Sequence, residues 1–592
     1  MDVERTGSPL GVCVLPQPPD NCARTCSYPD YIHEILGHAG VCCSSVAPKD
    51  LPESLAELRI LLTVGGTPLP DDTLDALGRW VSGGGAWISI AGTCGADDLF
   101  GVKGETAVHS SWGGGIGTLG EGYLFSTAAS HPMMQRLDMP LHYFNGVPVS
   151  ADDKNVLARV LDMHQRPTSR AAVVESSPGS GRCLLIGPDV TGTVVHIQQG
   201  RAVSRDGINA PDGTAPICDN VLKSGDGGVL DWIFDRQDVQ GVPDLRAFLQ
   251  PIADKWRELV LCSIFYLARE MHLALPVLWL YPRDLPAVAH MSHDTDGNSA
   301  DNARKMLKVI NEAGLRNTWC VLLPGYPAEL LRQIRSDGHE LAMHFDAMAE
   351  DRPWSKAEFD SQHRELVKLF GGETPVSNKN HYLRWEGDTE FFNWCVEKGI
   401  RLDQSKGASK TGEAGFNFGT CHPYFPVGPD GELIDVLELA TPTQDLIVFA
   451  PEQVASSLTD AVVRHHGVLH LLFHPAHIEK PDVEKALLAA VRSARNAGME
   501  WWTARRINDW ERARRAASWR DFSLTANGAE VTLRSEDALP GASIMWLGAE
   551  AGYVEVDGAA GEARTVERWG FKFQSVTFDI EPCSEHRLRT GF

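Results

Sequence analysis

Apolar and polar residues alternate with two different periods over the first hundred residues. Short apolar runs, "LGVCVLP", "LRILLTVGG" and "AWISIAG", predict buried strands. The segments between them, "YIHEILGHAG" and "DDTLDALGRWVSGGG", carry apolar residues at helical spacing and end in glycine, which predicts amphipathic helices. Strands that alternate with helices form a parallel sheet, so residues 10–105 predict an α/β fold.

The rest of the chain divides by the same patterns into further domains. Residues 106–240 are rich in Gly and Ser, and we expect them to complete a first domain, 1–240, with an insertion. A long helical pattern that starts near Gly228 predicts a helical connector over 241–284. Strands and helices alternate again over 285–512, a length suited to a (β/α) barrel, and the short strands of 513–592 predict a small β-sandwich. The fold class is therefore α/β multidomain.

Composition narrows the classes of partner. The net charge of −24, with no basic stripe, argues against a nucleic-acid partner. No apolar run is long enough to span a membrane, and the first ten residues lack the pattern of a secretory signal. The 13 cysteines are scattered and form no CxxC pair, which favours reduced thiols and a cytoplasmic protein.

The first domain offers one candidate nucleophile. Cys94, in "AGTCGADD", follows a predicted strand and lies between glycines, as a nucleophile at a strand-to-helix turn would. A histidine base with a nearby glutamate does not follow it in this domain. We therefore interpret Cys94 as a bystander and expect this domain to supply binding surface or oligomer contacts.

The second domain places polar residues after its apolar runs. Asp294 and Asp296 occur in "SHDTDG", His344 in "GHELAMH", His381 in "NKNHYLRW" and His474 in "LLFHP". Two carboxylates this close repel each other when both are ionised, unless a cation lies between them. The pattern predicts a metal ion at the strand ends, or one carboxylate that acts as a base.

The order of these segments resembles that of the polysaccharide deacetylases, the NodB-homology family, over residues 285–512. "SHDTDG" is similar to the family's "TFDDG", "NTWCVLL" to "ATFFV", and "GHELAMH" to "GHEIGNH". The first domain resembles the flavodoxin-like, glutamine-amidotransferase-like domain that also occurs as a non-catalytic trimerisation module in some glycosidases. That likeness implies a possible homo-oligomer formed through the N-terminal domain.

The resemblance to the deacetylases implies a role for each candidate site residue. Asp294 would be the catalytic base and His474 the proton donor to the leaving nitrogen. Asp296 and His344 would bind the metal. Arg384 would orient the catalytic aspartate, and Asp403, in "GIRLDQSKG", would be a second orienting acid.

Two positions depart from the family's pattern. Thr295 separates the paired aspartates, and Met348 stands one helical turn after His344, where the family has its second histidine ligand. A thioether suits soft ions, so we expect its sulfur to point away from the metal. We predict His381 as the third ligand, with Asp346 as the next candidate; otherwise the site is degenerate.

The resemblance implies a metal-dependent hydrolase of a C–N amide bond, with zinc as the favoured ion. Its substrate would be an N-acetylated sugar or polysaccharide, deacetylated by activated water. Two alternatives stay open: a carbohydrate-binding or assembly protein with a degenerate barrel, and a hydrolase of a non-sugar amide. Four tryptophans would either stack on sugar or pack in the core: Trp385, Trp394, Trp501 and Trp502. We interpret His470 as structural, and His293 and His477 either line the site or only neighbour it.

Overall fold

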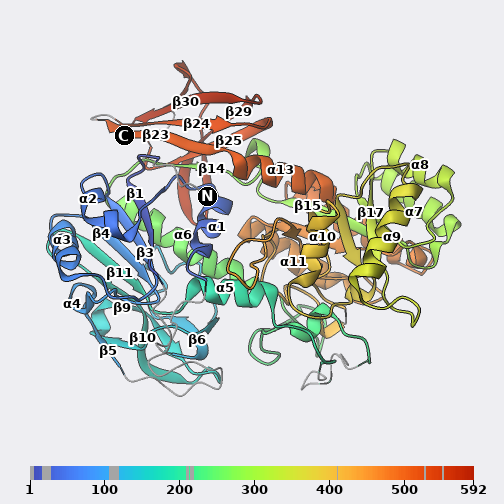
Figure 1. Cartoon of the computed structure of the whole chain (residues 1–592), viewed down its shortest axis with the longest axis horizontal. Helices are drawn as coiled ribbons and strands as arrows, with labels where there is room; N and C mark the ends of the chain where they lie inside the picture. Colours follow the sequence, from blue (N-terminus) through green and yellow to red (C-terminus); the bar gives the residue numbers. More distant parts are fainter. Residues whose placement is uncertain are drawn as a thin grey trace. The chain divides into compact units, whose positions relative to one another are not determined.

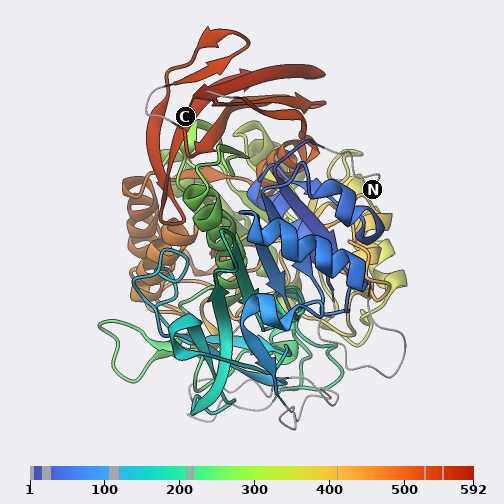
Figure 2. The ribbon, with the colours of Figure 1, turned by 90° about the vertical axis from the view of Figure 1, so that its left-hand side faces the viewer.

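The structure is a computed structural model of the 592-residue chain, shown in Figures 1 and 2. It describes residues 6–16, 28–105, 119–207, 213, 219–409, 411–525, 528–549 and 553–591. The chain forms two compact units. The first contains residues 1–195, 255–284 and 512–592, and the second contains residues 196–254 and 285–511.

The first unit is built on a sheet whose core is parallel. Its strands are β1 (Leu10–Val14), β2 (Ser44–Ser45), β3 (Ile60–Val64), β4 (Ala86–Ile90) and β11 (Arg182–Ile186). They lie in the order β2-β1-β3-β4-β11, the order of flavodoxin-like sheets. Helices α1 (Tyr31–Ala39) and α3 (Asp71–Ser82) connect the strands, and Figure 2 shows the blue helices over the blue strands. The strands and helices predicted for residues 10–90 are confirmed.

Antiparallel strands extend this sheet beyond β11. They are β10 (Pro167–Ser176), β9 (Val156–Leu161), β6 (Glu121–Ser126) and β7 (Leu141–Phe144). Cys94 lies after β4 at φ 58°, and its side chain is fully buried. Its sulfur is 3.6 Å from both the hydroxyl of Thr63 and the carbonyl oxygen of Gly65, and burial raises the pKa of the thiol. A thiol buried in this way is not poised for nucleophilic attack.

The last eighty residues contribute two antiparallel sheets to the same unit. One contains β23 (Ser518–Thr525), β24 (Gly528–Ser535), β30 (Ser584–Gly591), β26 (Val554–Val556) and β27 (Ala559–Ala560). The other contains β25 (Leu539–Leu547), β29 (Phe571–Ile580), β28 (Arg564–Arg568) and an upstream strand, β14 (Leu275–Leu278). The connector before the barrel therefore ends as a strand of a C-terminal sheet.

The helix predicted before the barrel is shorter than its pattern indicates. Helix α6 runs from Ile252 to Glu270, whereas the residues from Gly228 to Gln250 contain only turns and the short strands β12 (Gln237–Asp238) and β13 (Arg246–Ala247). Pro243 and Pro251 explain the difference, because proline is tolerated at a helix start but not in its interior. No helix among the described residues is long and apolar enough to cross a membrane.

The second unit contains an eight-stranded sheet whose paired strands are all parallel and which is curled as a half-barrel. Its strand order is β20-β19-β18-β17-β16-β15-β21, and β22 also pairs with β15. The strands are β15 (Val288–Asp294), β16 (Thr318–Val321), β17 (Glu340–Phe345), β18 (Ser377–Asn380), β19 (Leu402–Asp403), β20 (Leu437–Glu438), β21 (Val468–Leu472) and β22 (Glu500–Trp502).

Helices separate these strands along the chain. They are α7 (Ala300–Glu312), α8 (Ala328–Ser336), α9 (Lys356–Leu369), α10 (Glu390–Glu397), α11 (Glu452–His465) and α12 (Val483–Asn496). Their apolar faces share one core with the strands, which includes Met306, Leu331 and Leu487. The alternate residues His290, Ser292 and Asp294 share the other face of β15, since side chains alternate along a strand. One face of the half-barrel is therefore polar although it is buried.

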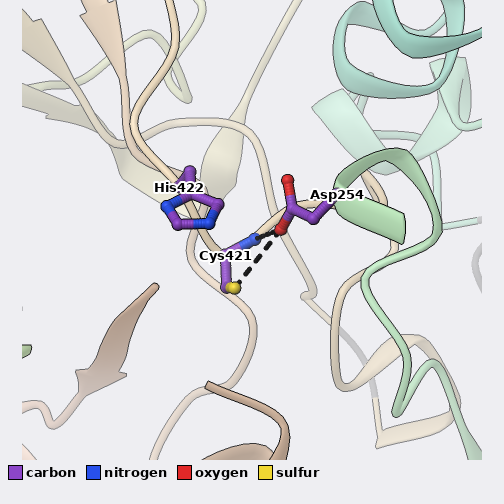
Figure 3. Close-up of side chains that lie close together, drawn as sticks. All are labelled: Asp254, Cys421 and His422. Carbon is purple, nitrogen blue, oxygen red and sulfur yellow. Dashed lines mark hydrogen bonds between the residues drawn. The ribbon is translucent and has the colours of Figure 1, made fainter. Parts of the chain in front are cut away.

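A buried carboxylate ties the start of α6 to the segment before β21. Asp254 accepts a hydrogen bond from the hydroxyl of Thr420 at 2.7 Å. It also accepts one from the backbone N–H of Cys421 at 2.7 Å, and the Cys421 thiol lies 3.3 Å away (Figure 3). His422 lies beside them, with its Nε2 2.9 Å from the carbonyl oxygen of His465. Although Asp, Cys and His are metal-ligating types, hydrogen bonds within the protein account for this group, and we interpret it as a structural clamp.

The clamp predicts a specific loss of stability. Asp254→Ala leaves the Cys421 N–H and the Thr420 hydroxyl without this acceptor, and should lower the free energy of unfolding by about 1–3 kcal/mol. Asp301→Ala is the control, because the side chain of Asp301 is 96% exposed and should change stability by less than about 0.5 kcal/mol. Urea denaturation measures both. Equal free energies of unfolding for the two variants would show that Asp254 does not stabilise the fold.

Candidate metal and catalytic site

Four parallel strands deliver polar side chains to one edge of the second unit's sheet. Asp294 ends β15, and Asp296 follows it in the short helix η5 (Asp296–Asn298). His344 lies in β17, and His381 opens η6 (His381–Leu383) directly after β18. His474 follows β21. Because the carboxyl ends of parallel strands lie at the same edge, residues far apart in the sequence meet there.

The carboxylate of Asp296 is the centre of this group. Its Oδ1 lies 3.3 Å from Nε2 of His344. Its Oδ2 lies 3.3 Å from Nε2 of His381 and 3.6 Å from Nε2 of His474. Burial would raise the pKa of Asp296, but the nearby imidazoles of His344, His381 and His474 outweigh it and hold the pKa well below its usual range.

His344 is oriented so that one nitrogen faces the carboxylates. Its Nδ1 lies 2.8 Å from the carbonyl oxygen of Lys379, which can only accept, so Nδ1 carries the proton. Its Nε2 points to Asp296 and lies 3.8 Å from the carboxylate of Asp294. This nitrogen and the Oδ1 of Asp296 are buried and make no hydrogen bond with any described residue. Unsatisfied buried ligand atoms that face one another fit a bound cation.

His381 is supported from behind by a second carboxylate. Its Nδ1 lies 2.9 Å from Asp346, which also accepts a hydrogen bond from Arg352 at 2.9 Å. Burial lowers the pKa of His381, but Asp296 and Asp346 raise it to about 9. An imidazole whose outer nitrogen is held by a carboxylate is the usual arrangement of a histidine that ligates a metal.

Asp296, His344 and His381 together fit a divalent transition ion. One ligand atom from each lies within 4.8 Å of the other two. Two imidazoles and a carboxylate are a donor set that suits zinc and related ions. The structure brings together the three residues predicted as ligands, and Asp346, the alternative, lies behind His381 as its hydrogen-bond partner.

His474 lies beside the three candidate ligands and pairs with a buried aspartate. Its Nδ1 is hydrogen-bonded to the buried carboxylate of Asp445, which also lies 3.2 Å from Nδ1 of His477. Burial lowers the pKa of His474, but the charge of Asp445 raises it to about 9. Burial raises the pKa of Asp445, but the two imidazoles lower it to about 2. His474 is therefore protonated near neutral pH, as a proton donor must be.

Asp294 lies against a buried lysine, Lys379, that the sequence pattern does not indicate as a site residue. The ammonium of Lys379 is 3.5 Å from the carboxylate of Asp294 and donates a hydrogen bond to the hydroxyl of Ser292 at 2.5 Å. Lys379 is fully buried. The sequence feature that could have indicated Lys379 is a lysine inside a short strand, "SNKN". No sequence feature indicates Asp445, which lies in "TPTQDL".

Two predicted orienting residues do not reach Asp294. The guanidinium of Arg384 pairs with Glu386 and with the carbonyl oxygen of Ala347. Asp403, in β19, accepts hydrogen bonds at 2.8 Å from Asn378 and Ser405, and burial raises its pKa. Since Asn378 and Lys379 are neighbours in β18, their side chains point to opposite faces, and Asp403 lies on the face away from Lys379.

The structure corrects one further expectation, and for the four tryptophans it favours packing in the core, the second of the two alternatives. β17 ends at Phe345, so His344 and Met348 do not share a helical face. The N–H of Met348 instead donates to Asp346 at 3.2 Å. The tryptophans are packed rather than displayed: Trp385, Trp501 and Trp502 are buried, and Trp394 packs against the aromatic residues of the core. None of the four presents an open stacking face.

The remaining histidines are bound within the barrel. His470 contacts Ser292 and the carbonyl oxygen of Ala440, both at 2.9 Å, and burial holds its pKa well below the usual range. His293 lies 2.8 Å from the carbonyl oxygen of Phe473 and 2.7 Å from the amide of Asn317. His293 is structural by these contacts, whereas His470 is linked through Ser292 to Lys379.

No family model and no curated protein matches this chain. Solved structures match at low overall similarity. A candidate polysaccharide deacetylase of O-antigen biosynthesis from Bordetella bronchiseptica is 18% identical, covers 35% of this chain and 90% of its own, and has a TM-score of 0.25. A family 4 acetyl xylan esterase from Clostridium thermocellum, solved with a cobalt ion, is 16% identical over 37% of this chain and 89% of its own, with a TM-score of 0.24.

A β-galactosidase from Bacillus circulans sp. alkalophilus is 11% identical over 32% of this chain and 29% of its own, with a TM-score of 0.24. The matching structures thus include carbohydrate deacetylases and esterases together with glycosidases.

Proposed function

We propose that this protein is a metal-dependent hydrolase that removes an acyl group from a carbohydrate amide, with an N-acetylated sugar or polysaccharide as substrate. One observation carries the proposal. Asp296, His344 and His381 present facing ligand atoms beside a lysine-paired carboxylate, Asp294, and a protonated imidazole, His474. These are the parts that acyl hydrolysis requires.

A divalent ion held by the three ligands would polarise the carbonyl and favour the ionised form of a water molecule. Asp294 takes the proton of the attacking water as the bond from its oxygen to the carbonyl carbon forms. His474 gives its proton to the leaving nitrogen as the C–N bond breaks. The ammonium of Lys379, 3.5 Å from the carboxylate of Asp294, would hold this carboxylate in place by charge attraction.

The rival proposal is a binding or assembly protein with a degenerate barrel. Met348 favours it, since the usual second histidine is missing. Against it stands His381, which supplies an imidazole to the same group and has its own carboxylate partner. A site that had lost its metal would not be expected to keep unsatisfied buried atoms facing one another.

Metal content tests the ligand assignment. The purified protein should bind about one zinc ion per chain, because two imidazoles and a carboxylate converge. Asp296→Ala and His344→Ala should lose the ion, and His381→Ala should weaken binding by more than the ~10–100-fold that removal of an outer hydrogen-bond partner causes. Elemental analysis and titration with a zinc chelator measure these changes.

His363→Ala is the control for metal content, since His363 lies in α9 and is not among the residues whose ligand atoms converge. The assignment is wrong if the wild-type protein stays free of metal after zinc supplementation. If His381→Ala binds zinc as the wild type does, His381 is not the third ligand.

The proposed base gives a separate prediction. Asp294→Asn keeps the shape of the side chain but cannot accept the proton, so turnover should fall about a hundredfold or more. Zinc content should not change, because Asp294 is not one of the three proposed ligands. Acetate release from chito-oligosaccharides, measured with zinc content, checks both. Normal turnover of this variant would assign Asp294 to structure.

A chain of hydrogen bonds supports the position of Lys379. Nδ1 of His470 faces the carbonyl oxygen of Ala440 and so carries the proton. Its Nε2 then accepts from the hydroxyl of Ser292, whose oxygen accepts from Lys379. His290 is the neighbour of His470 in the sheet, equally buried, but it bonds Trp502 and Gln404 instead.

The two histidines therefore form a matched pair for a test of this chain. His470→Ala and His290→Ala should lose similar stability, since both rings are fully buried. Only His470→Ala should lower kcat, by about tenfold or ~1.4 kcal/mol in the barrier, because only it removes the acceptor of Ser292. Ser292→Ala should lower kcat in the same way and Ser292→Thr should restore it. Equal kcat for the two histidine variants would make the chain merely structural.

A further inference from the structure

Large apolar side chains are exposed immediately beside the candidate site. Tyr382 is 53% exposed, Ile447 46% and Phe449 39%. Tyr382 directly follows His381, and the other two lie in the segment that starts at Asp445. Because Tyr382 contacts His381 whereas Phe449 contacts His477, the apolar residues form two separate contact surfaces rather than one continuous patch.

Tyr382 lies on the side of the candidate ligands. Its ring centroid is 5.1 Å from that of His381, in an edge-to-face arrangement. Its backbone is left-handed, with φ 60° and ψ 16°, and Leu383 follows at φ 51° with a buried side chain. Two successive left-handed residues turn the chain sharply after His381. Leu383 anchors the turn in the core, and Tyr382 is left outside it.

Ile447 and Phe449 lie on the side of the proton donor. The carbonyl oxygen of Asp445 accepts hydrogen bonds from the N–H groups of Val448 and Phe449, and the N–H of Ile447 donates to Ala450 at 2.7 Å. The ring of Phe449 is 5.7 Å from that of His477, which in turn contacts His474. The carboxylate that holds His474 therefore also begins the turn that displays these two side chains.

The backbone conformation at position 447 is unfavourable for an isoleucine, and the fold does not explain why an isoleucine stands there. Its φ is 77°, a left-handed conformation that β-branched residues avoid and that glycine adopts freely. The side chain is not buried, so packing does not offset the strain. Strained residues of this kind gather at ligand-binding positions, and large apolar groups exposed together mark contact surfaces.

We propose that Tyr382 on one side, and Ile447 with Phe449 on the other, pack against the C–H faces of two successive pyranose rings of an N-acylated oligosaccharide. The proposal rests on the proposed function and extends it: two surfaces that flank the reacting centre require a substrate with a ring on each side of it. An oligomer should therefore contact both surfaces and bind more tightly, whereas an N-acetylated monosaccharide should contact only one surface.

Binding to an inactive background tests the proposal. In Asp294→Asn protein, isothermal titration with chitotetraose should show affinity at least about tenfold weaker after Tyr382→Ala or Phe449→Ala. Tyr553→Ala and Leu433→Ala are matched controls, because both residues are exposed to a similar extent elsewhere. Binding of N-acetylglucosamine should change less than binding of the tetramer.

Ile447→Gly separates function from structure. Glycine relieves the left-handed strain, so the melting temperature should stay the same or rise, while affinity for chitotetraose falls. A merely structural isoleucine would not give opposite changes in the two readouts.

Unchanged affinity for the tetramer in all three variants would overturn the two contact surfaces, and so would an Asp294→Asn background that binds no oligosaccharide. Failure of the proposed function gives a different result. The protein then holds no zinc at Asp296, His344 and His381, whether or not it binds an oligosaccharide.

Discussion

The unusual feature on which the second unit depends is a carboxylate surrounded by imidazoles at the end of a parallel sheet. Asp296 has His344, His381 and His474 within 3.6 Å. Such a concentration of charge and unsatisfied ligand atoms is unfavourable in a buried place unless a cation or a bound substrate completes it. The surrounding residues all serve this arrangement: Lys379, Asp346 and Asp445 each hold one member of the group in position.

These supporting residues give the two sides of the site different properties. On one side, Asp346 and the carbonyl oxygen of Lys379 fix the two histidines with a nitrogen facing Asp296. On the other side, Asp445 raises the pKa of His474 to about 9 after burial has acted to lower it. His344 and His381 are thus oriented to bind a cation, and His474, in the same buried group, is protonated and can donate a proton.

Much of this arrangement is predictable from the sequence. The apolar runs that end in polar residues indicate the strand ends, and so Asp294, Asp296, His344, His381 and His474. Arg384 was not predictable, because the left-handed pair Tyr382 and Leu383 turns the chain after His381. Lys379 was missed because lysine is rarely buried in a strand. Asp445 precedes His474 by 29 residues, and only the tertiary fold brings them together.

Anomalous diffraction at the zinc absorption edge, from crystals grown with zinc, tests the metal assignment most directly. We expect one peak about 2.0–2.2 Å from Nε2 of His344, Nε2 of His381 and a carboxylate oxygen of Asp296. No peak at this position, or a peak only at Asp254 and Cys421 or at Asp445 and His477, would contradict the proposed centre.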